Sequence, residues 1–578
     1  METVKLTIDN NQVEVPAGST ILDAAKQAGI NIPTLCYHPE LGTKAMCRLC
    51  LVEVEGARTL QTACSQPATE GMVVRTNTPL VRETRKLNLE LLLSNHPQDC
   101  LNCIRNQNCE LQAISERLGV RSQRFNESKP KRLPVDDSSP ALVRDPSKCI
   151  LCRRCVAVCH QVQGVGAIYP INRGDATVIA PTGGAPLNNV ACTFCGQCIQ
   201  VCPVGAIYEA DDTPKVWAAL ADPDKHVVVQ TAPAIRVAIG EVLGMAPGAI
   251  TTGKLVAALR RLGFAKVFDT DFAADLTIME EGYELIERLE HQGKLPMITS
   301  CSPGWIKYIE HFYPEYLDHL SSCKSPQQMF GAMAKTYYAQ KAGIPAERIV
   351  VVSIMPCTAK KFEAGRPEMH GSGFQDVDLV LTTRELGRMI REAGIDFEAL
   401  AEEEFDAPLG ISTGAGVIFG ASGGVMEAAL RTVYEVVTGS ELATVDFDQV
   451  RGLAGVKEAT VDLSGKTIKV AVANGLSNAK KLMDQIKAGT ADYQFIEIMC
   501  CPGGCIGGGG QPIPTNGVTR AARMKAIYEA DRGMPLRKAH QNPAVQQLYQ
   551  EYLGKPLGEK SHRLLHTSYT KRGKYAGF

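Results

Sequence analysis

The sequence has neither a long hydrophobic run nor an excess of charge of one sign. No stretch reaches the about 18 consecutive apolar residues that a membrane-spanning helix needs, so we expect no membrane span. Lys and Arg (61) balance Asp and Glu (62), which leaves a net charge of −1 and indicates neither a nucleic-acid nor an anionic-membrane partner. Residues 1–18 alternate polar and apolar side chains and show no signal-peptide pattern. These absences predict a cytoplasmic protein.

What the chain has in abundance is cysteine, with 21 among 578 residues. In a reducing compartment, clustered thiols are more often metal ligands than disulfides. Most of them fall into five groups whose spacing is typical of iron–sulfur ligation. A chain of this length is too long for one hydrophobic core, so we expect several domains.

The first group follows a strand–turn–strand–helix pattern. Residues 2–8 and 12–16 alternate like two strands, 9–11 carry a turn signal, and 20–28 resemble a helix. This order predicts a β-grasp ferredoxin domain over residues 1–78 with one 2Fe–2S cluster. A structural zinc site is the alternative. The predicted ligands are Cys36, Cys47, Cys50 and Cys64.

The second group begins with a histidine. A helix is predicted over 79–95, and the domain over 79–121. Three cysteines leave one iron of a 4Fe–4S cluster without a thiolate, and His96 is placed to bind it. A neutral imidazole in place of a thiolate removes negative charge and raises the reduction potential. An ordinary histidine near a helix end is the alternative. The predicted ligands are His96, Cys100, Cys103 and Cys109.

The third and fourth groups form an internal repeat within a domain predicted over residues 122–209. Its first part, 122–148, is rich in charge, Pro and Ser, and predicts a linker or a wrapping loop. The repeat has the spacing of bacterial two-cluster ferredoxins, in which the fourth cysteine of each run binds the other cluster. One 4Fe–4S cluster would be held by Cys149, Cys152, Cys155 and Cys202, and the other by Cys192, Cys195, Cys198 and Cys159.

From residue 210 to 578 the composition changes to alternating strands and helices. We expect strands at 227–230, 265–269, 350–354, 377–382 and 467–472, and a helix at 252–262. This alternation predicts a large α/β domain with one open sheet, so the chain as a whole is multidomain, α+β and α/β. The fifth group of cysteines directly follows predicted strands, where open sheets place their ligands.

Three segments of this large domain resemble the signature motifs of the FeFe (iron-only) hydrogenases. They read Thr299-Ser-Cys-Ser-Pro-Gly-Trp305, Met355-Pro-Cys-Thr-Ala-Lys-Lys-Phe-Glu363 and Glu497-Ile-Met-Cys-Cys-Pro-Gly-Gly-Cys-Ile-Gly-Gly-Gly509. The resemblance implies reversible hydrogen oxidation, 2H⁺ + 2e⁻ ⇌ H2. It also implies an H-cluster, in which one cysteine joins a 4Fe–4S cube to a two-iron subsite with CO, cyanide and azadithiolate ligands.

The resemblance assigns residues to this cluster. Cys505 matches the bridging cysteine, and Cys357 and Cys501 match ligands of the cube. Lys360 would donate to a cyanide, which suits an ammonium group beside an anionic ligand. Further side chains expected to line the subsite are Met355, Met499, Pro326 and Gln327.

A proton route is implied as well. The family route maps onto Cys301, Glu281, Ser321, Glu284 and, at the surface, Arg288. Glu281, Glu284 and Arg288 are spaced i, i+3 and i+7, so one face of a helix would carry all three. Spacing alone fits a solvated charged face equally well. The relay interpretation therefore depends on the resemblance.

The first motif departs from its commonest form, which has two adjacent cysteines. Here the second position is Ser302, and a hydroxyl is a poor ligand for iron that selects thiolate. Either Cys301 binds the cube and Ser302 becomes a weaker proton carrier, or another thiol replaces the missing ligand. Cys323 and Cys500 are the unassigned cysteines, and both also fit buried apolar positions. From the sequence we favour Cys301 as the ligand.

The amino-terminal modules indicate electron input from partners. The resemblance implies a hetero-oligomer with a flavin/NAD(P)-binding iron–sulfur subunit, a small 2Fe–2S subunit and ferredoxin, in an electron-bifurcating hydrogenase. We expect the NAD(P) site on another chain, because no glycine-rich dinucleotide fingerprint occurs at a strand–helix junction here. The alternatives are a stand-alone ferredoxin hydrogenase, a hydrogen sensor, an iron–sulfur assembly factor and a complex I-like iron–sulfur subunit.

Overall fold

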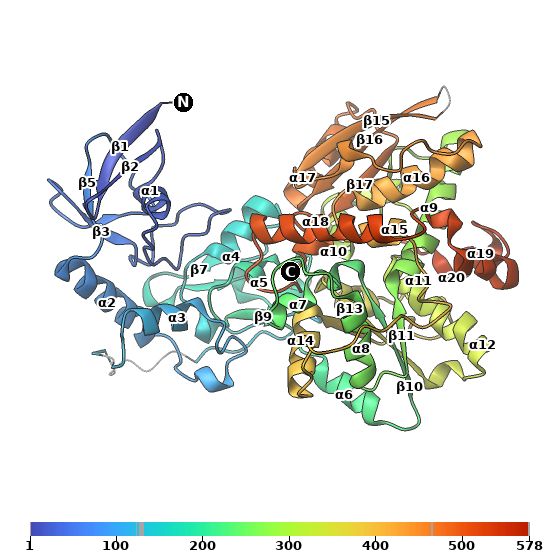
Figure 1. Cartoon of the computed structure of the whole chain (residues 1–578), viewed down its shortest axis with the longest axis horizontal. Helices are drawn as coiled ribbons and strands as arrows, with labels where there is room; N and C mark the ends of the chain where they lie inside the picture. Colours follow the sequence, from blue (N-terminus) through green and yellow to red (C-terminus); the bar gives the residue numbers. More distant parts are fainter. Residues whose placement is uncertain (1, 123, 126–131, 464–465, 576–578) are drawn as a thin grey trace.

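The chain runs along the long axis of an elongated molecule. The structure, a computed structural model, describes residues 2–122, 124–125, 132–463 and 466–575. The amino-terminal sheet lies at one end, the cysteine-rich segments follow, and the large domain fills the other end (Figure 1). Residues 126–131 of the predicted linker lie outside the described part. Among the described helices, none is long and apolar enough to cross a membrane.

The amino-terminal domain is a five-stranded mixed sheet with one helix against it. The strand order is β2-β1-β5-β3-β4. The strands are β1 (Thr3–Ile8), β2 (Asn11–Pro16), β3 (Leu51–Val54), β4 (Gln61–Thr62) and β5 (Val73–Arg75). Asp9 and Asn10 turn the first hairpin with φ of 46° and 69°, a conformation that Asx residues tolerate. Helix α1 (Ile21–Gln27) begins at a capping box on Thr20. The predicted strands and helix are confirmed.

Two helices connect this sheet to the cysteine repeat. Helix α2 (Pro79–Ser94) begins at Thr78, whose hydroxyl accepts a hydrogen bond from the Val81 N–H, and confirms the helix predicted there. The Arg85 guanidinium donates to the Leu51 carbonyl oxygen at 2.7 and 3.1 Å, which ties α2 to the sheet. Helix α3 (Glu110–Arg117) follows, and its Glu110 N–H donates to the carbonyl oxygen of Pro203. The second cysteine group is thereby held against the repeat.

The two halves of the cysteine repeat have the same backbone conformation at matching positions. Leu151 and Arg153 in the first half, and Phe194 and Gly196 in the second, all have φ between 55° and 71°. Part of the predicted linker is ordered, because β6 (Leu142–Arg144) pairs antiparallel with β9 (Ile207–Glu209). The other elements here are β7 (Tyr169–Ile171), β8 (Val178–Ala180), α4 (Arg154–Ala157), α5 (Gln197–Val201) and α6 (Thr213–Ala221).

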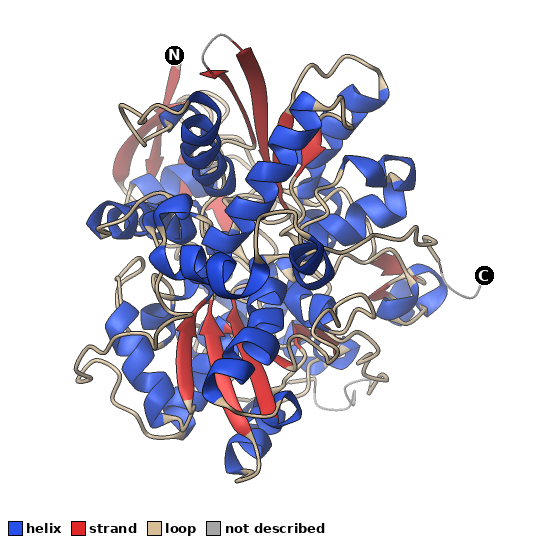
Figure 2. Cartoon of the chain, turned by 90° about the vertical axis from the view of Figure 1, so that its right-hand side faces the viewer, coloured by secondary structure: helices blue, strands red, loops and turns tan. Residues whose placement is uncertain are grey.

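The large domain contains two four-stranded sheets rather than the single open sheet predicted (Figure 2). The first, all parallel, has the order β11 (Lys266–Asp269), β10 (His226–Thr231), β13 (Ile349–Met355), β14 (Leu379–Thr382). The second has the order β12 (Met297–Ile298), β17 (Phe495–Met499), β16 (Lys466–Asn474), β15 (Val456–Leu463), with β15 antiparallel.

A long buried helix explains why the prediction of one sheet was wrong. Helix α9 (Thr270–Glu290) contributes Phe272 and Leu276 to the core of the first sheet, and Ile278 and Leu285 to the core that packs on the second. Because apolar side chains surround this helix on several sides, it separates two cores. The alternation of strand-like and helix-like segments in the sequence predicts the strands, but it does not predict that they divide into two sheets.

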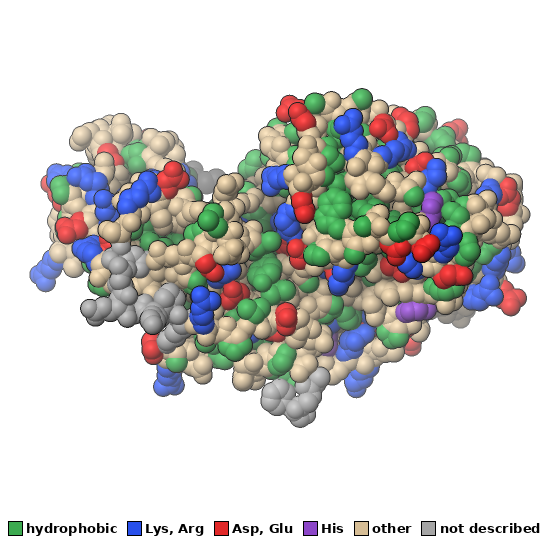
Figure 3. Space-filling model, turned by 90° about the horizontal axis from the view of Figure 1, so that it is seen from below, with side chains coloured by type: hydrophobic (Ala, Val, Ile, Leu, Met, Phe, Trp, Pro, Cys, Tyr) green, Lys and Arg blue, Asp and Glu red, His purple; other side chains and the backbone are tan. Residues whose placement is uncertain are grey.

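The remaining helices cover the two sheets. They are α7 (Ile239–Val242), α8 (Thr252–Arg261), α10 (Pro303–Phe312), α11 (Pro326–Met333), α12 (Ala339–Ala342), α13 (Ala359–Ala364), α14 (Thr383–Glu392), α15 (Gly414–Ile418), α16 (Gly424–Thr438), α17 (Leu476–Lys487), α18 (Gly517–Gly533), α19 (Pro543–Leu548) and α20 (Glu559–Leu565). On the face shown in Figure 3, basic and acidic side chains are interspersed, as the near-zero net charge leads one to expect.

Candidate functional site

A cavity lies where the carboxyl ends of strands from both sheets meet. Its walls come from the segments that directly follow β10, β12, β13 and β17, and its empty space is about 720 Å³. All three signature segments contribute to it. Its lining residues include Cys301, Ser302, Pro326, Gln327, Met355, Cys357, Lys360, Met499, Cys500, Cys501 and Cys505. The sequence prediction that the reactive loops converge at strand ends is therefore confirmed.

The thiols expected to hold the H-cluster line this cavity together. Cys357 follows β13, and Cys501 and Cys505 follow β17. Burial raises the pKa of Cys505 to about 12 and that of Cys357 well above its ordinary value. The Lys360 ammonium acts in the opposite direction on both pKa values but does not outweigh burial. Buried thiols suit soft iron, which deprotonates them on binding. This donor set fits a 4Fe–4S cube in the cavity.

One basic side chain, Lys360, lines this cavity among the described residues. Its Nζ donates to Glu363 Oε2 at 2.8 Å and to the Cys301 carbonyl oxygen at 3.1 Å. Gln327 Nε2 also donates to Glu363 Oε2, at 3.1 Å, whereas Gln327 Oε1 is buried without a partner. Both side chains are therefore held by one carboxylate. A free amide oxygen and a spare ammonium proton remain for a polar group in the cavity.

Glycines let the third signature segment approach the cysteine repeat. A Cβ on Gly509 would lie 2.2 Å from the Cys195 carbonyl oxygen, and one on Gly508 would lie 2.1 Å from that of Pro356. Gln197 Nε2 donates to the Gly507 carbonyl oxygen at 2.9 Å. The backbone around the cavity thus contacts the backbone that carries the second set of repeat cysteines.

Cys301, Ser302 and Cys500 line the cavity with different neighbours. Burial and then the nearby Glu281 carboxylate raise the pKa of the Cys301 thiol. Ser302 Oγ accepts a hydrogen bond from the Cys500 N–H at 3.2 Å. The Cys500 thiol lies within hydrogen-bonding reach of the thiols of Cys501 and Cys195. Cys301 therefore lies near both Glu281 and Cys505, whereas Cys500 lies near Cys501 and Cys195.

Hydrogen bonds link four of the predicted proton-route residues, Glu281, Ser321, Glu284 and Arg288. Ser321 Oγ donates to Glu284 Oε2 at 2.8 Å, and Arg288 Nη2 donates to Glu284 Oε1 at 2.6 Å. The Ser321 hydroxyl is also within hydrogen-bonding reach of Glu281. Burial, and then the neighbouring Glu284, raise the pKa of Glu281 to about 8. The alternative of a solvated charged face does not fit, because Glu281 is 2% exposed.

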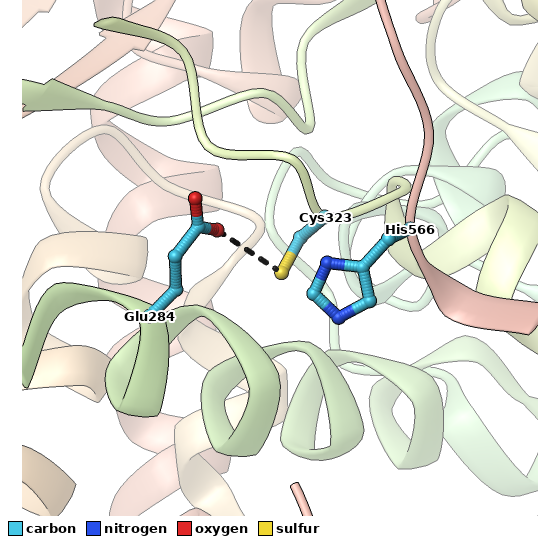
Figure 4. A group of neighbouring side chains, drawn as sticks. All are labelled: Glu284, Cys323 and His566. Atoms are coloured by element: carbon cyan, nitrogen blue, oxygen red, sulfur yellow. Dashed lines mark hydrogen bonds between the residues drawn. The ribbon is translucent and has the colours of Figure 1, made fainter. Parts of the chain in front are cut away.

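A cluster that sequence reasoning missed adjoins this path. Glu284, Cys323 and His566 bring their ligand atoms within 4.8 Å of one another (Figure 4). Cys323 Sγ donates to Glu284 Oε2 at 3.8 Å. The two ring nitrogens of His566 are taken by Ser322 and Glu280, at 2.9 and 3.0 Å. These two hydrogen bonds satisfy both ring nitrogens of His566. Because His566 lies far along the chain from α9, no sequence pattern indicated that it would adjoin Glu284.

The repeat cysteines gather as the two-cluster spacing predicts. One cavity is lined by Cys149, Cys152, Cys155 and Cys202, and a second by Cys159, Cys192, Cys195 and Cys198. Each set therefore takes three thiols from one half of the repeat and one from the other. The exchange of the fourth ligand, inferred from spacing, is reproduced by these positions.

The amino-terminal ligands are placed less uniformly. Cys50 Sγ lies 3.3 Å from Cys64 Sγ, and the Cys36 and Cys47 thiols are within hydrogen-bonding reach of each other. In the next module, Cys100 is exposed and Cys103 and Cys109 are half-buried. His96 is buried, and its Nδ1 has no partner among the described residues. An orphaned buried ring nitrogen fits a ligand position, since buried polar atoms otherwise find partners.

Known proteins are similar to this chain along its whole length. The NADP-reducing hydrogenase subunit HndD of Solidesulfovibrio fructosivorans is 52% identical over 99% of this chain and 100% of its own length. The chain belongs to the FeFe hydrogenase family. Iron hydrogenase 1 of Clostridium pasteurianum is 42% identical to this hydrogenase, covering 98% of it and 100% of the relative. A solved structure of the FeFe-hydrogenase HydA1 of Chlamydomonas reinhardtii is 47% identical, with a TM-score of 0.57, over 63% of this chain and 100% of that one.

Family profiles divide the hydrogenase in chain order. They match a 2Fe-2S iron-sulfur cluster binding domain (1–79), an NADH-ubiquinone oxidoreductase-G iron-sulfur binding region (85–124), and an NADH-quinone oxidoreductase subunit 3 ferredoxin-like domain (139–208). The C-terminal domain of the iron only hydrogenase large subunit (225–509) and the iron hydrogenase small subunit (518–572) follow.

The enzyme class and the classes of cluster are therefore confirmed. The protein is an oxidoreductase acting on H2, with 2Fe–2S and 4Fe–4S clusters feeding an H-cluster. The small-subunit match was not predicted, because residues 518–572 carry no cysteine by which to recognise it. The complex I-like alternative explains only the amino-terminal profiles, since the profile at 225–509 belongs to hydrogenases.

Proposed function

We propose that this hydrogenase is the hydrogen-converting subunit of a multi-subunit, NAD(P)-linked and electron-bifurcating enzyme in the cytoplasm. The observation that carries the proposal is identity along the whole chain to a subunit of an NADP-reducing hydrogenase. The profiles at 85–124 and 139–208, named for NADH-oxidising complexes, support it. The expected partners are a flavin/NAD(P)-binding iron–sulfur subunit, a small 2Fe–2S subunit and ferredoxin.

Electrons would follow the order of the domains. They enter at the 2Fe–2S cluster of the β-grasp domain, pass the cluster of His96 and the two cubes of the repeat, and reach the H-cluster. Figure 1 shows these segments in sequence along the molecule. The last step is supported by the contact of Gly509 with Cys195, a ligand of the second repeat cube. Three accessory 4Fe–4S clusters and one 2Fe–2S cluster complete this chain.

At the cavity, the two-iron subsite supplies the chemistry that makes and breaks the H–H bond. Cys357, Cys501 and Cys505 would hold the cluster, and Cys505 would join its two parts. Lys360, positioned by Glu363, would donate to an anionic ligand of the subsite. Met355 and Met499, each 3% exposed, would exclude water around it.

Protons would travel through Cys301, Glu281, Ser321, Glu284 and Arg288. With a pKa near 8, Glu281 both binds and releases a proton close to neutral pH, as an efficient relay requires. The Ser321 hydroxyl, which donates to Glu284 and reaches Glu281, transfers the proton between two carboxyl groups that do not touch. Arg288 fixes the outer carboxylate near the surface.

The proposal is tested with anaerobically purified, cofactor-loaded chain, alone and with its partner subunits. Alone, it should oxidise H2 with a viologen dye, show infrared bands of bound CO and cyanide, and fail to reduce NAD(P)⁺. With the flavin subunit, NAD(P)⁺ reduction by H2 should require oxidised ferredoxin at the same time.

Other results would exclude parts of the proposal. NAD(P)⁺ reduction without ferredoxin would exclude bifurcation. Ferredoxin reduction by the isolated chain at the full rate of the complex would favour the stand-alone ferredoxin hydrogenase. Infrared bands without appreciable turnover would indicate a hydrogen sensor.

A further inference from the structure

The replacement of the expected fourth cube ligand by Ser302 leaves three assigned thiols for four irons. Cys357, Cys501 and Cys505 line the cavity, and Ser302 offers a hydroxyl. That hydroxyl already accepts the Cys500 N–H at 3.2 Å. Because cluster iron selects thiolate, a fourth sulfur within this cavity is the natural replacement.

We propose that Cys500 supplies the fourth thiolate of the 4Fe–4S cube, and that the Cys301 thiol stays free to carry protons. This inference rests on the proposed H-cluster site. It differs from the assignment of Cys301 as ligand that the sequence alone favoured.

Cys500 has the position that this role requires. It lines the same cavity as the three assigned ligands, and its thiol reaches the thiol of Cys501. Its Sγ has a polar contact with Gln163 Oε1 at 3.7 Å. Binding to iron would replace this weak contact, while the Cys500 N–H stays bonded to Ser302 Oγ.

The neighbouring helix leaves space for a sulfur at this place. A Cβ on Gly304 would lie 2.6 Å from Cys500 Sγ, so the missing side chain makes room for the sulfur. Gly304 belongs to the first turn of α10 (Pro303–Phe312), where the unpaired N–H groups and the helix dipole stabilise negative charge.

The competing thiols lie elsewhere. Cys323 does not line the cavity, and its Sγ contacts Glu284 Oε2 at 3.8 Å. Cys301 lines it near Cys505, but its thiol is influenced more strongly by the Glu281 carboxylate, at the start of the proton route. Cys500 also reaches Cys195, a ligand of the second repeat cube. That cube already has four thiols around its own cavity, which Cys500 does not line.

The test compares single variants of the full chain, produced first without the maturation proteins that supply the two-iron subsite. In Cys500→Ala we expect loss of about four irons per chain, or conversion of one cube to a three-iron form. In Cys301→Ser and Cys323→Ser, iron content and the spectrum of the reduced clusters should match the parent. The 2Fe–2S and repeat-cluster signals in each sample report whether the chain has folded.

Loading with the two-iron subsite identifies the cluster that is lost. Cys500→Ala should show no infrared bands of CO and cyanide, because the subsite has no cube to join. Cys500→Ala/Ser302→Cys should regain both the iron and the bands, since the thiolate returns at the adjacent position.

Three results would overturn the proposal. They are a Cys500→Ala chain with full iron, a Cys500→Ala chain that loses four irons but still takes up the subsite, and a Cys301→Ser chain that loses the cube. Failure of the H-cluster assignment itself would look different, because the parent chain would then show no infrared bands.

Discussion

Replacing Glu281 with glutamine should stop proton delivery while leaving every cluster in place. Glu281 is 2% exposed, and its Oε2 has no hydrogen-bond partner among the described residues. With a pKa of about 8, the carboxyl group is about nine-tenths protonated at pH 7. The neutral amide of Glu281→Gln has nearly the same shape and charge as that form. It cannot release a proton, so hydrogen evolution from reduced viologen should fall by on the order of 10²- to 10⁴-fold.

The same variant should behave differently in alkali. A raised pKa means that the folded chain binds more protons than the unfolded one above the unfolded value, so stability falls as pH rises through 8. Between pH 7 and pH 9 the parent should lose about 1 kcal/mol of unfolding free energy from this group, since one pKa unit corresponds to about 1.4 kcal/mol. Glu281→Gln lacks this loss, and thermal unfolding of the two chains at both pH values measures it.

The control is Glu287→Gln, which makes the same chemical change at an exposed position of α9. It should keep the parental rate. If Glu281→Gln turned over hydrogen like the parent with full infrared bands, the relay would be refuted. If its rate fell together with its iron content, Glu281 would be structural. Equal alkaline destabilisation of parent and variant would show that its pKa is not raised.

Three further substitutions test other parts of the molecule. His96→Cys should keep its cluster and lower that cluster's reduction potential, measured by redox titration with paramagnetic resonance, because thiolate restores negative charge; an unchanged potential would mean that His96 is not a ligand. Gly509→Ala places a Cβ 2.2 Å from the Cys195 carbonyl oxygen and should cost about 1–3 kcal/mol of unfolding free energy, whereas Gly533→Ala, with nothing within 4 Å, should not. Lys360→Met should reduce the infrared bands of the subsite without changing accessory iron; full bands would exclude Lys360 as a donor to it.

Local pattern predicted most of the elements. The hairpin of β1 and β2 and the start of α2 are specified by turn and capping residues a few positions apart, so the sequence contains the whole signal. The repeat ligands were predictable for the same reason, because their spacing fixes which thiols share a cluster.

What escaped prediction depends on contacts between distant segments. The division into two sheets follows from the burial of α9 on several sides, and β12 has only two residues. The cluster of Glu284, Cys323 and His566 joins positions up to 282 residues apart. The sequence left Cys323 and Cys500 as equal candidates for the missing ligand, and only the fold shows that Cys500 lines the cavity and Cys323 does not.

The position of helix α9 has a consequence for the stability of the enzyme. The segment that carries Glu281 and Glu284 also lies between two hydrophobic cores of the large domain and contributes side chains to both. Its amides should therefore exchange with solvent only when the whole domain opens. Proton transfer then relies on rotation of side chains along a backbone that does not unfold locally. A substitution that destabilised this helix would also destabilise the fold of the domain. We therefore expect evolution to change the side chains of the proton route more readily than the position of its backbone.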